Sequence, residues 1–222
     1  NMTSEDAATM IAQFANITGL GQDEYENLGS AIVDLGNKSA TTESAIMEMA
    51  QRFASAASVA GLSETDILGF SAALSSLGIE AEAGGSALST FTAKVQLAVE
   101  TGDGLNDFAT VAGMTAQDFR KAWGEDAAGA LTAFITGLSN TERNGKSAIA
   151  VLSDMGITEV RLRNAILSLS ESGDLLTDSL NISSSAFQKN NALAKEAETR
   201  YATTESKITM YENSVTNLQA AF

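Results

Sequence analysis

The sequence lacks cysteine, histidine and proline altogether. Without cysteine there are no disulfides, no thiolate metal ligands and no cysteine nucleophile. Without histidine, catalytic triads with an imidazole base, histidine metal sites and imidazole proton shuttles are excluded as well. The side chains left for catalysis are carboxylates, lysines, tyrosines and hydroxyls.

The absence of proline bears on the fold, because nothing in the 222 residues forces a helix to stop. Alanine, leucine, glutamate and methionine are abundant, and all four favour helices. Hydrophobic residues make up 44 % of the chain, which is enough to build a buried core. The composition therefore predicts an all-α protein.

The chain is acidic, with a formal net charge of −15. Residues 1–110 carry 15 acids and 3 bases, whereas residues 111–222 carry 13 acids and 10 bases. A chain without a basic patch is not expected to bind nucleic acid through its phosphates. No apolar run approaches the roughly 20 residues that span a bilayer, so we expect membrane contact only through segments outside this one. The acidic half is interpreted as a solvated surface.

One short phrase occurs three times: "GLSETDILGF" from Gly61, "GMTAQDFRKAW" from Gly113 and "GITEVRLRNAI" from Gly156. A glycine after a helix supplies the left-handed position that ends it. The hydroxyl of Ser63, Thr115 or Thr158 then caps the next helix, and the apolar residues on either side of the cap pack together as a staple. Each phrase predicts a tight glycine corner between two helices, with no catalytic role.

These corners and the apolar periodicity predict a compact domain of about ten short helices. The expected helices cover residues 4–16, 23–36, 42–59, 64–76, part of 78–99, 105–111, 116–123, 126–138, 142–154 and 159–171. Gly84 and Gly85 are unusual within such a segment, and they predict either a close helix crossing or a break. A phosphate-binding loop is excluded because no lysine–serine pair follows the glycines.

The last part of the chain differs, because residues 184–222 contain no glycine and repeat apolar residues every seven positions. This period predicts one long helix of about 58 Å with a coiled-coil seam. The seam, our candidate self-association site, consists of Phe187, Ala194, Tyr201, Ile208, Tyr211, Val215, Leu218 and Phe222. Asn190 and Thr204 interrupt it with polar side chains. The first half of the helix fits packing on its own domain equally well, whereas the second half resembles the start of a longer rod.

The sequence thus predicts two parts, a compact helical domain over residues 1–180 and a long helix over residues 184–222. Neither part contains a recognisable catalytic or metal-binding pattern. Candidate carboxylate pairs for acid–base chemistry are Glu80–Glu82, Glu125–Asp126 and Glu196–Glu198. Nothing around them distinguishes an acid from a base, which disfavours a glycosidase. The stretch "TGDGLNDF" (101–108) lacks the ligand spacing of a calcium loop. We expect no enzyme activity and no cofactor.

Four longer stretches carry a resemblance to a known family. They are residues 28–87, 108–138 ("FATVAGMTAQDFRKAWGEDAAGALTAFITGL"), 154–180 and 183–208. In this order they resemble the core region of the tail tape-measure protein family of long-tailed bacteriophages and prophages. One departure is Ala127, where family members often have proline. No single stretch is a catalytic fingerprint. The resemblance is specific because all four stretches occur in the same order.

The resemblance implies a structural role. Tape-measure proteins are built into the growing tail, the tail tube assembles around them, their length sets the tail length, and they leave the lumen before DNA passes. The implied partners are further copies of the chain, the tail tube protein, tail assembly chaperones and tail-tip or baseplate proteins. The implied location is the lumen of the virion tail, after synthesis in the cytoplasm of the bacterial host.

Two alternatives stay open at this stage. A compact domain over residues 1–180 is a poor ruler, so the chain could instead be a helical adaptor or interaction module without a role in tails. A lytic or carboxylate-based hydrolase is the third possibility, which a peptidoglycan-release assay would test.

Overall fold

The computed structural model describes residues 4–143, 145–202 and 207–214, and every regular element in these ranges is helical. In chain order the elements are α1 (Ser4–Thr18), the 3-10 helix η1 (Gln22–Glu24), α2 (Tyr25–Lys38), α3 (Glu43–Val59), α4 (Glu64–Ser76), α5 (Ala81–Thr101), α6 (Leu105–Val111), α7 (Ala116–Glu125), α8 (Ala127–Arg143), α9 (Ala148–Asp154), α10 (Val160–Glu171), α11 (Gly173–Lys189) and α12 (Ala192–Tyr201). Residues 207–214 are helical as well. The all-α prediction is confirmed. Within the described ranges, no helix is both long and apolar enough to cross a membrane.

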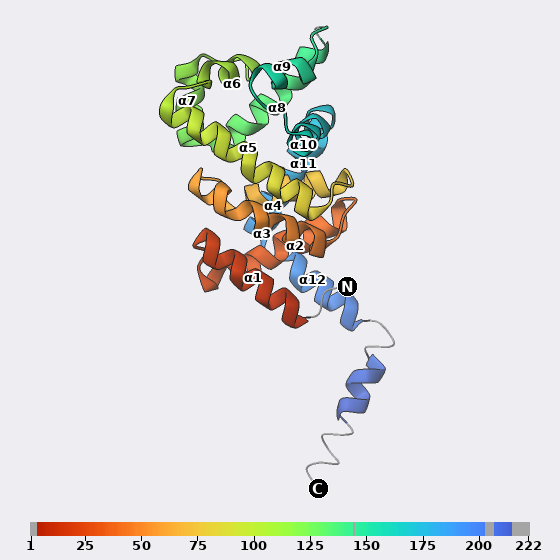
Figure 1. Ribbon diagram of the computed structural model, residues 1–222. Coiled ribbons are helices and arrows are strands. Elements are labelled where there is room, and N and C mark those ends of the chain that lie inside the picture. The colour runs from red at the N-terminus through yellow and green to blue at the C-terminus, as the bar shows by residue number, and fades with distance from the viewer. Residues whose placement is uncertain (1–3, 144, 203–206, 215–222) are drawn as a thin grey trace.

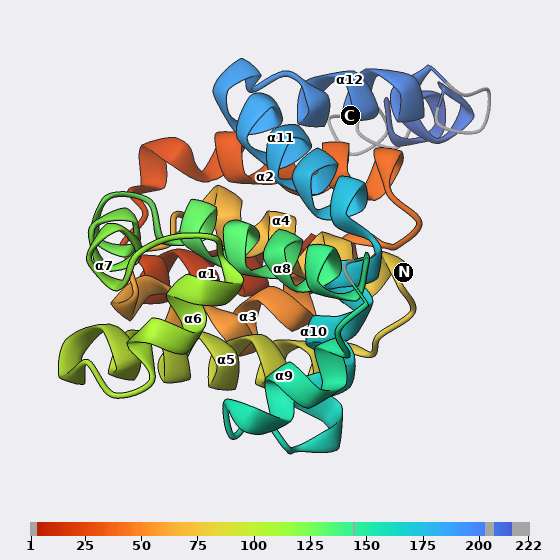
Figure 2. The same ribbon diagram turned by 90° about the horizontal axis from the view of Figure 1, so that it is seen from above.

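The helices stack into an elongated body, with α1 towards one end and α6, α7 and α9 at the other (Figure 1). In the middle, α3 packs on α5, and α11 packs on both α4 and α2. Viewed from above, α11 and α12 run along the side of the body formed by α2 (Figure 2). One continuous cluster of buried side chains extends from Phe14 in α1 to Ala186 in α11. A single core therefore holds the helices from α1 to α11 together.

Three crossings in this core require glycine because the backbones touch. The glycine pair lies inside α5, which continues unbroken, and a Cβ on Gly85 would lie 2.8 Å from the carbonyl oxygen of Met49 in α3. A Cβ on Gly69 of α4 would lie 2.9 Å from the Cα of Leu180 in α11. A Cβ on Gly137 of α8 would overlap the carbonyl group of Val111 in α6. Of the two structures predicted for the glycine pair, the close crossing is correct.

An aromatic cluster fills the end of the body formed by α5 to α8. The Phe91 ring lies 5.3 Å from that of Phe134 and 6.1 Å from that of Phe108, measured between centroids. Phe119 and Trp123 stack at 6.4 Å on the buried side of α7. The Trp123 indole N–H donates to Gln96 Oε1 at 2.6 Å, so the polar edge of this buried ring is satisfied.

At the three repeated phrases the chain turns from one helix to the next through a glycine at positive φ. The φ angles are 84° at Gly61, 72° at Gly113 and 72° at Gly156. In each turn the N–H of the following apolar residue donates to a carbonyl five residues earlier, as in Leu62 to Ala57 at 3.0 Å. This bond satisfies a carbonyl that the helix end would otherwise leave without a partner.

The helix caps after these turns agree with the sequence at two positions and differ at the third. Ser63 forms a capping box with Asp66, and Thr115 Oγ1 accepts from the N–H of Asp118. At the third turn the cap is Glu159 and not Thr158, because the Glu159 carboxylate accepts from the N–H groups of Arg161 and Leu162. A carboxylate can accept from two helical N–H groups at once, and its charge also favours a helix N-terminus, so the longer side chain takes the position.

The predicted helix over residues 142–154 is also wrong. Helix α8 continues to Arg143, and α9 begins only at Ala148, where Ser147 Oγ accepts from the N–H of Ala150. Gly145, at φ 77°, lies in the connection between the two helices and marks where the chain leaves the helical conformation. The apolar period alone did not locate this boundary.

The crossing of α6 and α8 can be tested with two glycine variants. Gly137→Ala is expected to lower the free energy of unfolding by about 1–3 kcal/mol or more, because the added methyl overlaps the Val111 carbonyl. Gly124→Ala in α7 is the matched control, since its Cβ meets nothing within 4 Å and alanine favours a helix by up to about 1 kcal/mol. Urea denaturation midpoints at unchanged slope measure both changes. Equal midpoints for the two variants would show that α6 leaves room for a side chain at Gly137 of α8.

The third cap gives a second test. Removing the carboxylate in Glu159→Ala is expected to cost about 1 kcal/mol of stability, since two helical N–H groups lose their acceptor. Thr158→Ala is the control and should change stability by less than half of that amount, because Thr158 provides no cap. The two variants differ by one position in the same turn, and thermal unfolding compares them directly. A larger loss of stability in Thr158→Ala than in Glu159→Ala would show that the threonine caps the helix.

Candidate self-association surface

The C-terminal part of the chain begins with α11, which the body holds firmly. Its inner face buries Leu176, Ser179, Ser183 and Ala186. Leu180 sits on Gly69 of α4, where the missing side chain lets the two backbones approach. The sequence placed the start of the last helix at residue 184, but α11 begins at Gly173. Its first three turns therefore belong to the core of the body.

The long uninterrupted helix predicted over residues 184–222 is not present in the described residues. Helix α11 ends at Lys189, Asn190 adopts a left-handed conformation with φ 44°, and α12 covers only Ala192–Tyr201. Helix α2 supplies the physical reason. The Asn27 side-chain amide donates to the Phe187 carbonyl at 2.8 Å, and Ser30 Oγ donates to Asn190 Oδ1 at 3.1 Å. These bonds satisfy the end of α11 from outside, so the chain can turn there.

The sequence contained a signal for this turn. Asn190 and Asn191 stand side by side, and asparagine is the residue that most often replaces glycine at the left-handed end of a helix. The sequence prediction nevertheless followed the seven-residue period, because Asn190 falls on a seam position, where a coiled coil tolerates a polar residue. The bonds from α2 could not be foreseen, since they join residues 160 positions apart.

The structure places the predicted seam residues in two environments. Phe187 is half-buried and packs against the core of its own chain, before the turn. Ala194 is exposed on α12, and Tyr201 at the end of that helix is 64 % exposed. Ile208 and Tyr211 are 54 % and 72 % exposed, and their spacing of three places them on one face of the helix over residues 207–214. Val215, Leu218 and Phe222 lie outside the described residues.

Large exposed apolar side chains thus gather in the C-terminal part. Besides the seam residues, Leu193 and Met210 are 41 % and 53 % exposed. Isolated apolar residues on a surface are ordinary, but such a concentration within one short segment is characteristic of a surface that pairs with another chain. These residues therefore form a candidate interaction surface.

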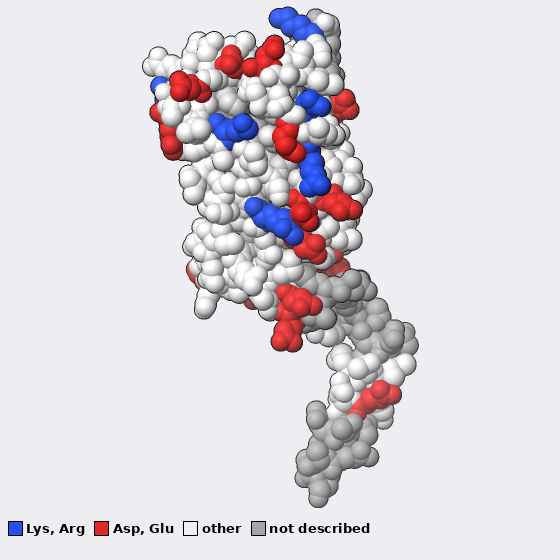
Figure 3. Space-filling view, viewed as in Figure 1, with Lys and Arg blue, Asp and Glu red and all other residues white. Residues whose placement is uncertain are grey.

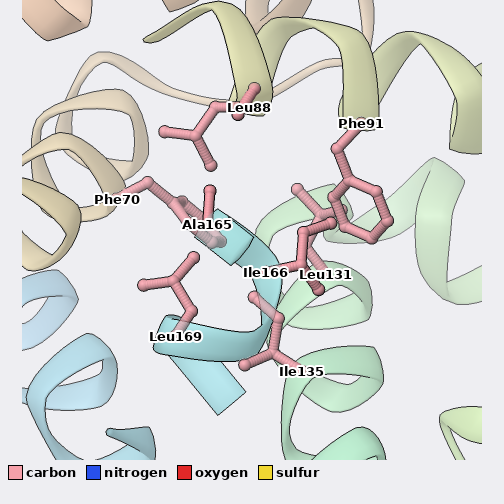
Figure 4. Close-up of a pocket in the computed structure, with 9 residues that line it drawn as sticks. Phe70, Leu88, Phe91, Leu131, Ile135, Ala165, Ile166 and Leu169 are labelled. Carbon is pink, nitrogen blue, oxygen red and sulfur yellow. The ribbon is translucent and has the colours of Figure 1, made fainter. Parts of the chain in front are cut away.

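A small apolar gap and an open groove lie in the described part of the body. The gap drawn in Figure 4 lies between α4, α5, α8 and α10, is lined entirely by apolar side chains such as Phe70, Leu131 and Ile166, and has a volume of about 10 Å³. That volume is at the lower limit for one water molecule, and apolar cavities of this kind stay dry. An open groove of about 420 Å³ between α5 and α10 contains Glu80, Glu82 and Arg161. Both carboxylates there are exposed to solvent.

Other acidic side chains have structural roles. Asp126 Oδ1 accepts from the N–H of Gly129 at 2.8 Å at the start of α8, and Glu125 lies 3.9 Å from Lys121 in an exposed pair. No group of histidine, cysteine, aspartate or glutamate residues in the described ranges could hold a metal ion. On the face shown in Figure 3, lysines and arginines are interspersed with acids and separated by broad uncharged areas. That face carries no continuous basic patch.

The family model of the phage-related minor tail proteins matches residues 1–122 of the chain. This match covers more than half of the chain. The chain belongs to this family. No curated protein and no solved structure matches it significantly.

Family membership makes the chain a phage tail protein and favours a structural role, as a component of the virion tail. The matched residues contain α1 to α6 and most of α7, including the α2 residues that hold the turn at Asn190. The exposed apolar residues from Leu193 onward lie beyond the match. The family match thus covers the first part of the body, from α1 into α7, and the candidate surface lies outside it.

Mutations can test the exposed seam residues independently of the half-buried Phe187. The double variant Tyr201→Ser/Ile208→Ser is expected to weaken self-association of the chain more than tenfold, because it removes two large apolar contacts. It should leave the unfolding midpoint unchanged, since both side chains are exposed. Sedimentation equilibrium and thermal unfolding measure the two quantities.

Phe187→Ala is the control for that experiment. It should lower stability by about 1–3 kcal/mol, because the ring packs against the core, and weaken self-association less than the double variant does. The candidate surface is wrong if Phe187→Ala weakens association as much as the double variant, or if neither variant affects it.

Proposed function

We propose that this chain is a segment of a tail tape-measure protein, which templates assembly of the tail tube, sets tail length and leaves the lumen before DNA ejection. The observation that carries the proposal is the family match to phage tail proteins on a chain whose regular elements, in the described residues, are all helices. The resemblance of residues 28–208 to the core region of tape-measure proteins supports the same assignment. The exposed apolar residues of the C-terminal part supply a surface for a measuring rod.

In this proposal the two parts of the chain have different tasks. The body from α1 to α11 is compact, and it serves as an assembly or anchoring module at one end of the rod. From Ala194 onward, a seven-residue period lets copies of the chain pair as a coiled coil, with Tyr201, Ile208 and Tyr211 in the seam. The rise per residue of a continuous helix is constant, which gives such a rod a fixed length for a given sequence.

The charge of the chain fits a location in the tail lumen. A net charge of −15 repels DNA, so a protein that shares the conduit with the genome is not retained on it. The partners of the proposal are further copies of the chain, the tail tube protein, tail assembly chaperones and tail-tip or baseplate proteins. The chain would be made in the cytoplasm of the bacterial host and incorporated as the tube grows.

One observation favours a second function. The body is a stack of short helices around a single core, an architecture that suits binding a partner better than measuring length. A helical interaction module of the tail, without a measuring role, has the same body. The continuation of the reading frame distinguishes the two, because a tape measure requires a long further stretch of helix and coiled coil.

Tail length measured by electron microscopy tests the measuring role. An in-frame duplication of residues 194–221 adds four heptads and keeps the seam in phase without repeating the turn at Asn190. If the segment is part of the ruler, tails lengthen by about 42 Å, or by one ring of the tube if growth is quantised. The matching deletion shortens them by the same amount.

The control places a second copy of the same segment after Gly145, in an exposed connection of the body. That insertion adds equal mass outside the rod and should leave tail length unchanged. Normal-length tails from the duplication would show that residues 194–221 do not measure, and the interaction module would then be the better account.

A further inference from the structure

The turn at Asn190 differs from the other left-handed positions of the body. In the described part of the chain, eight glycines have positive φ, and Asn190 is the sole non-glycine residue that does. A glycine at such a position favours the turn permanently, since it is a poor helix former. Asparagine is tolerated in the left-handed region and also continues a helix more readily than glycine does. Residue 190 is therefore compatible with two backbone conformations.

Contacts between α2 and the residues around the turn hold the bent conformation. Asn27 and Ser30 of α2 donate to the Phe187 carbonyl and to Asn190 Oδ1, and the Leu193 N–H donates to Ser30 Oγ at 3.4 Å. The Leu193 side chain rests on Gly29, where a Cβ would come within 3.1 Å of its methyl group. Even so, Leu193 is 41 % exposed, and Ala194 and Tyr201 further along α12 are exposed. The first turn of α12 thus bonds to and packs on α2, whereas Ala194 and Tyr201 are open to solvent.

The sequence on both sides of the turn fits a second conformation. The seven-residue period starts at Phe187, before the turn, and continues in the same phase through Ala194 and Tyr201, after it. A left-handed residue between these positions turns the chain, so Phe187, Ala194 and Tyr201 no longer lie on one helix face. They share a face only when residues 187–201 form one continuous helix. No glycine or proline lies in residues 184–222 to prevent that helix.

We propose that Asn190 is a hinge between α11 and α12. In the bent form α12 packs on α2 through Asn27, Ser30 and Leu193. In the straight form residues 173–201 are one helix, α12 has left α2, and Ala194 and Tyr201 lie in phase with Phe187. Contact with a second copy along the seam stabilises the straight form, whereas the contacts to α2 stabilise the bent form. The hinge would thus couple self-association to release of α12 from α2. That the partner is a second copy of the chain rests on the proposed function.

The absence of cysteine makes the hinge measurable by site-directed spin labelling. Labels at Asn181→Cys and Glu198→Cys lie at exposed positions of α11 and α12. In one continuous helix the backbones at these two positions are about 26 Å apart, and in the bent form they are closer. Continuous-wave and pulsed electron paramagnetic resonance together cover both ranges. A reference pair at Glu82→Cys and Glu100→Cys, both in the unbroken α5, should stay at about 27 Å throughout.

Two substitutions at the hinge form a matched pair. Asn190→Ala and Asn190→Gly both remove the side-chain oxygen that accepts from Ser30, but alanine favours the helix and glycine favours the left-handed turn. We expect the straight population to be at least tenfold larger in Asn190→Ala than in Asn190→Gly. In the unsubstituted chain it should rise with protein concentration.

The outcomes separate the hinge from the proposed function. Equal distance distributions in the two variants, or no population in either at the distance of one continuous helix, would overturn the hinge. Straightening of Asn190→Ala without self-association would support the hinge and remove the second copy as the group that stabilises the straight form. Straightening that rises in parallel with self-association would support both parts of the proposal.

Discussion

Close contact between helix backbones is the constraint on which the rest of this structure depends. Helix α5 passes α3 so closely that no side chain fits at Gly85, and α11 meets α4 in the same way at Gly69. Small residues at a crossing bring the helix axes together, and the large apolar side chains on either side then interdigitate. The crossing at Gly69 holds α11 against α4, and the last turn of α11 lies beside α2. There Asn27 and Ser30 bond to the end of the helix, at the turn at Asn190.

The sequence alone predicted those features that depend on interactions between residues close together in the chain. The predicted ranges 64–76 and 105–111 coincide with α4 and α6, and the pair Gly84–Gly85 lies at a helix crossing. Glu159 was missed because a hydroxyl residue stood one position earlier and capping preferences favour it, although the longer carboxylate reaches two N–H groups.

The break at Asn190 was missed for a different reason. A seven-residue period describes what residues 187–222 can form as a helix, but it contains no information about α2. The bonds from Asn27 and Ser30 cross 160 residues of sequence, and they turn an asparagine that a coiled coil tolerates into the end of a helix. The pattern therefore predicted the wrong conformation for residues 184–201, and the coiled coil stays a prediction. The tertiary contacts of α2 favour the turn over the continuous helix.

The acidic side chains of the body have structural roles. In the body, Asp66, Asp118 and Asp126 stand in the first turns or at the caps of helices, where a negative charge complements the helix dipole. Of the carboxylates that looked like candidates for chemistry in the sequence, Asp126 caps a helix start, and Glu80, Glu82, Glu125 and Glu198 are exposed to solvent. What the chain presents to its surroundings is an acidic body and a run of exposed apolar side chains beyond Asn190. These features fit a structural tail component that associates through its C-terminal part.

Cross-linking in assembled tails tests most directly whether that part associates as described. Tyr201→Cys introduces a single thiol into a chain that has none, at an exposed position of the seam. Mild oxidation of purified tails should join copies of the chain through residue 201, whereas a thiol at Thr136, exposed on α8, should stay unlinked. A residue-201 thiol that reacts with maleimide in intact tails but never links two copies would contradict the account, because the seam would then face solvent.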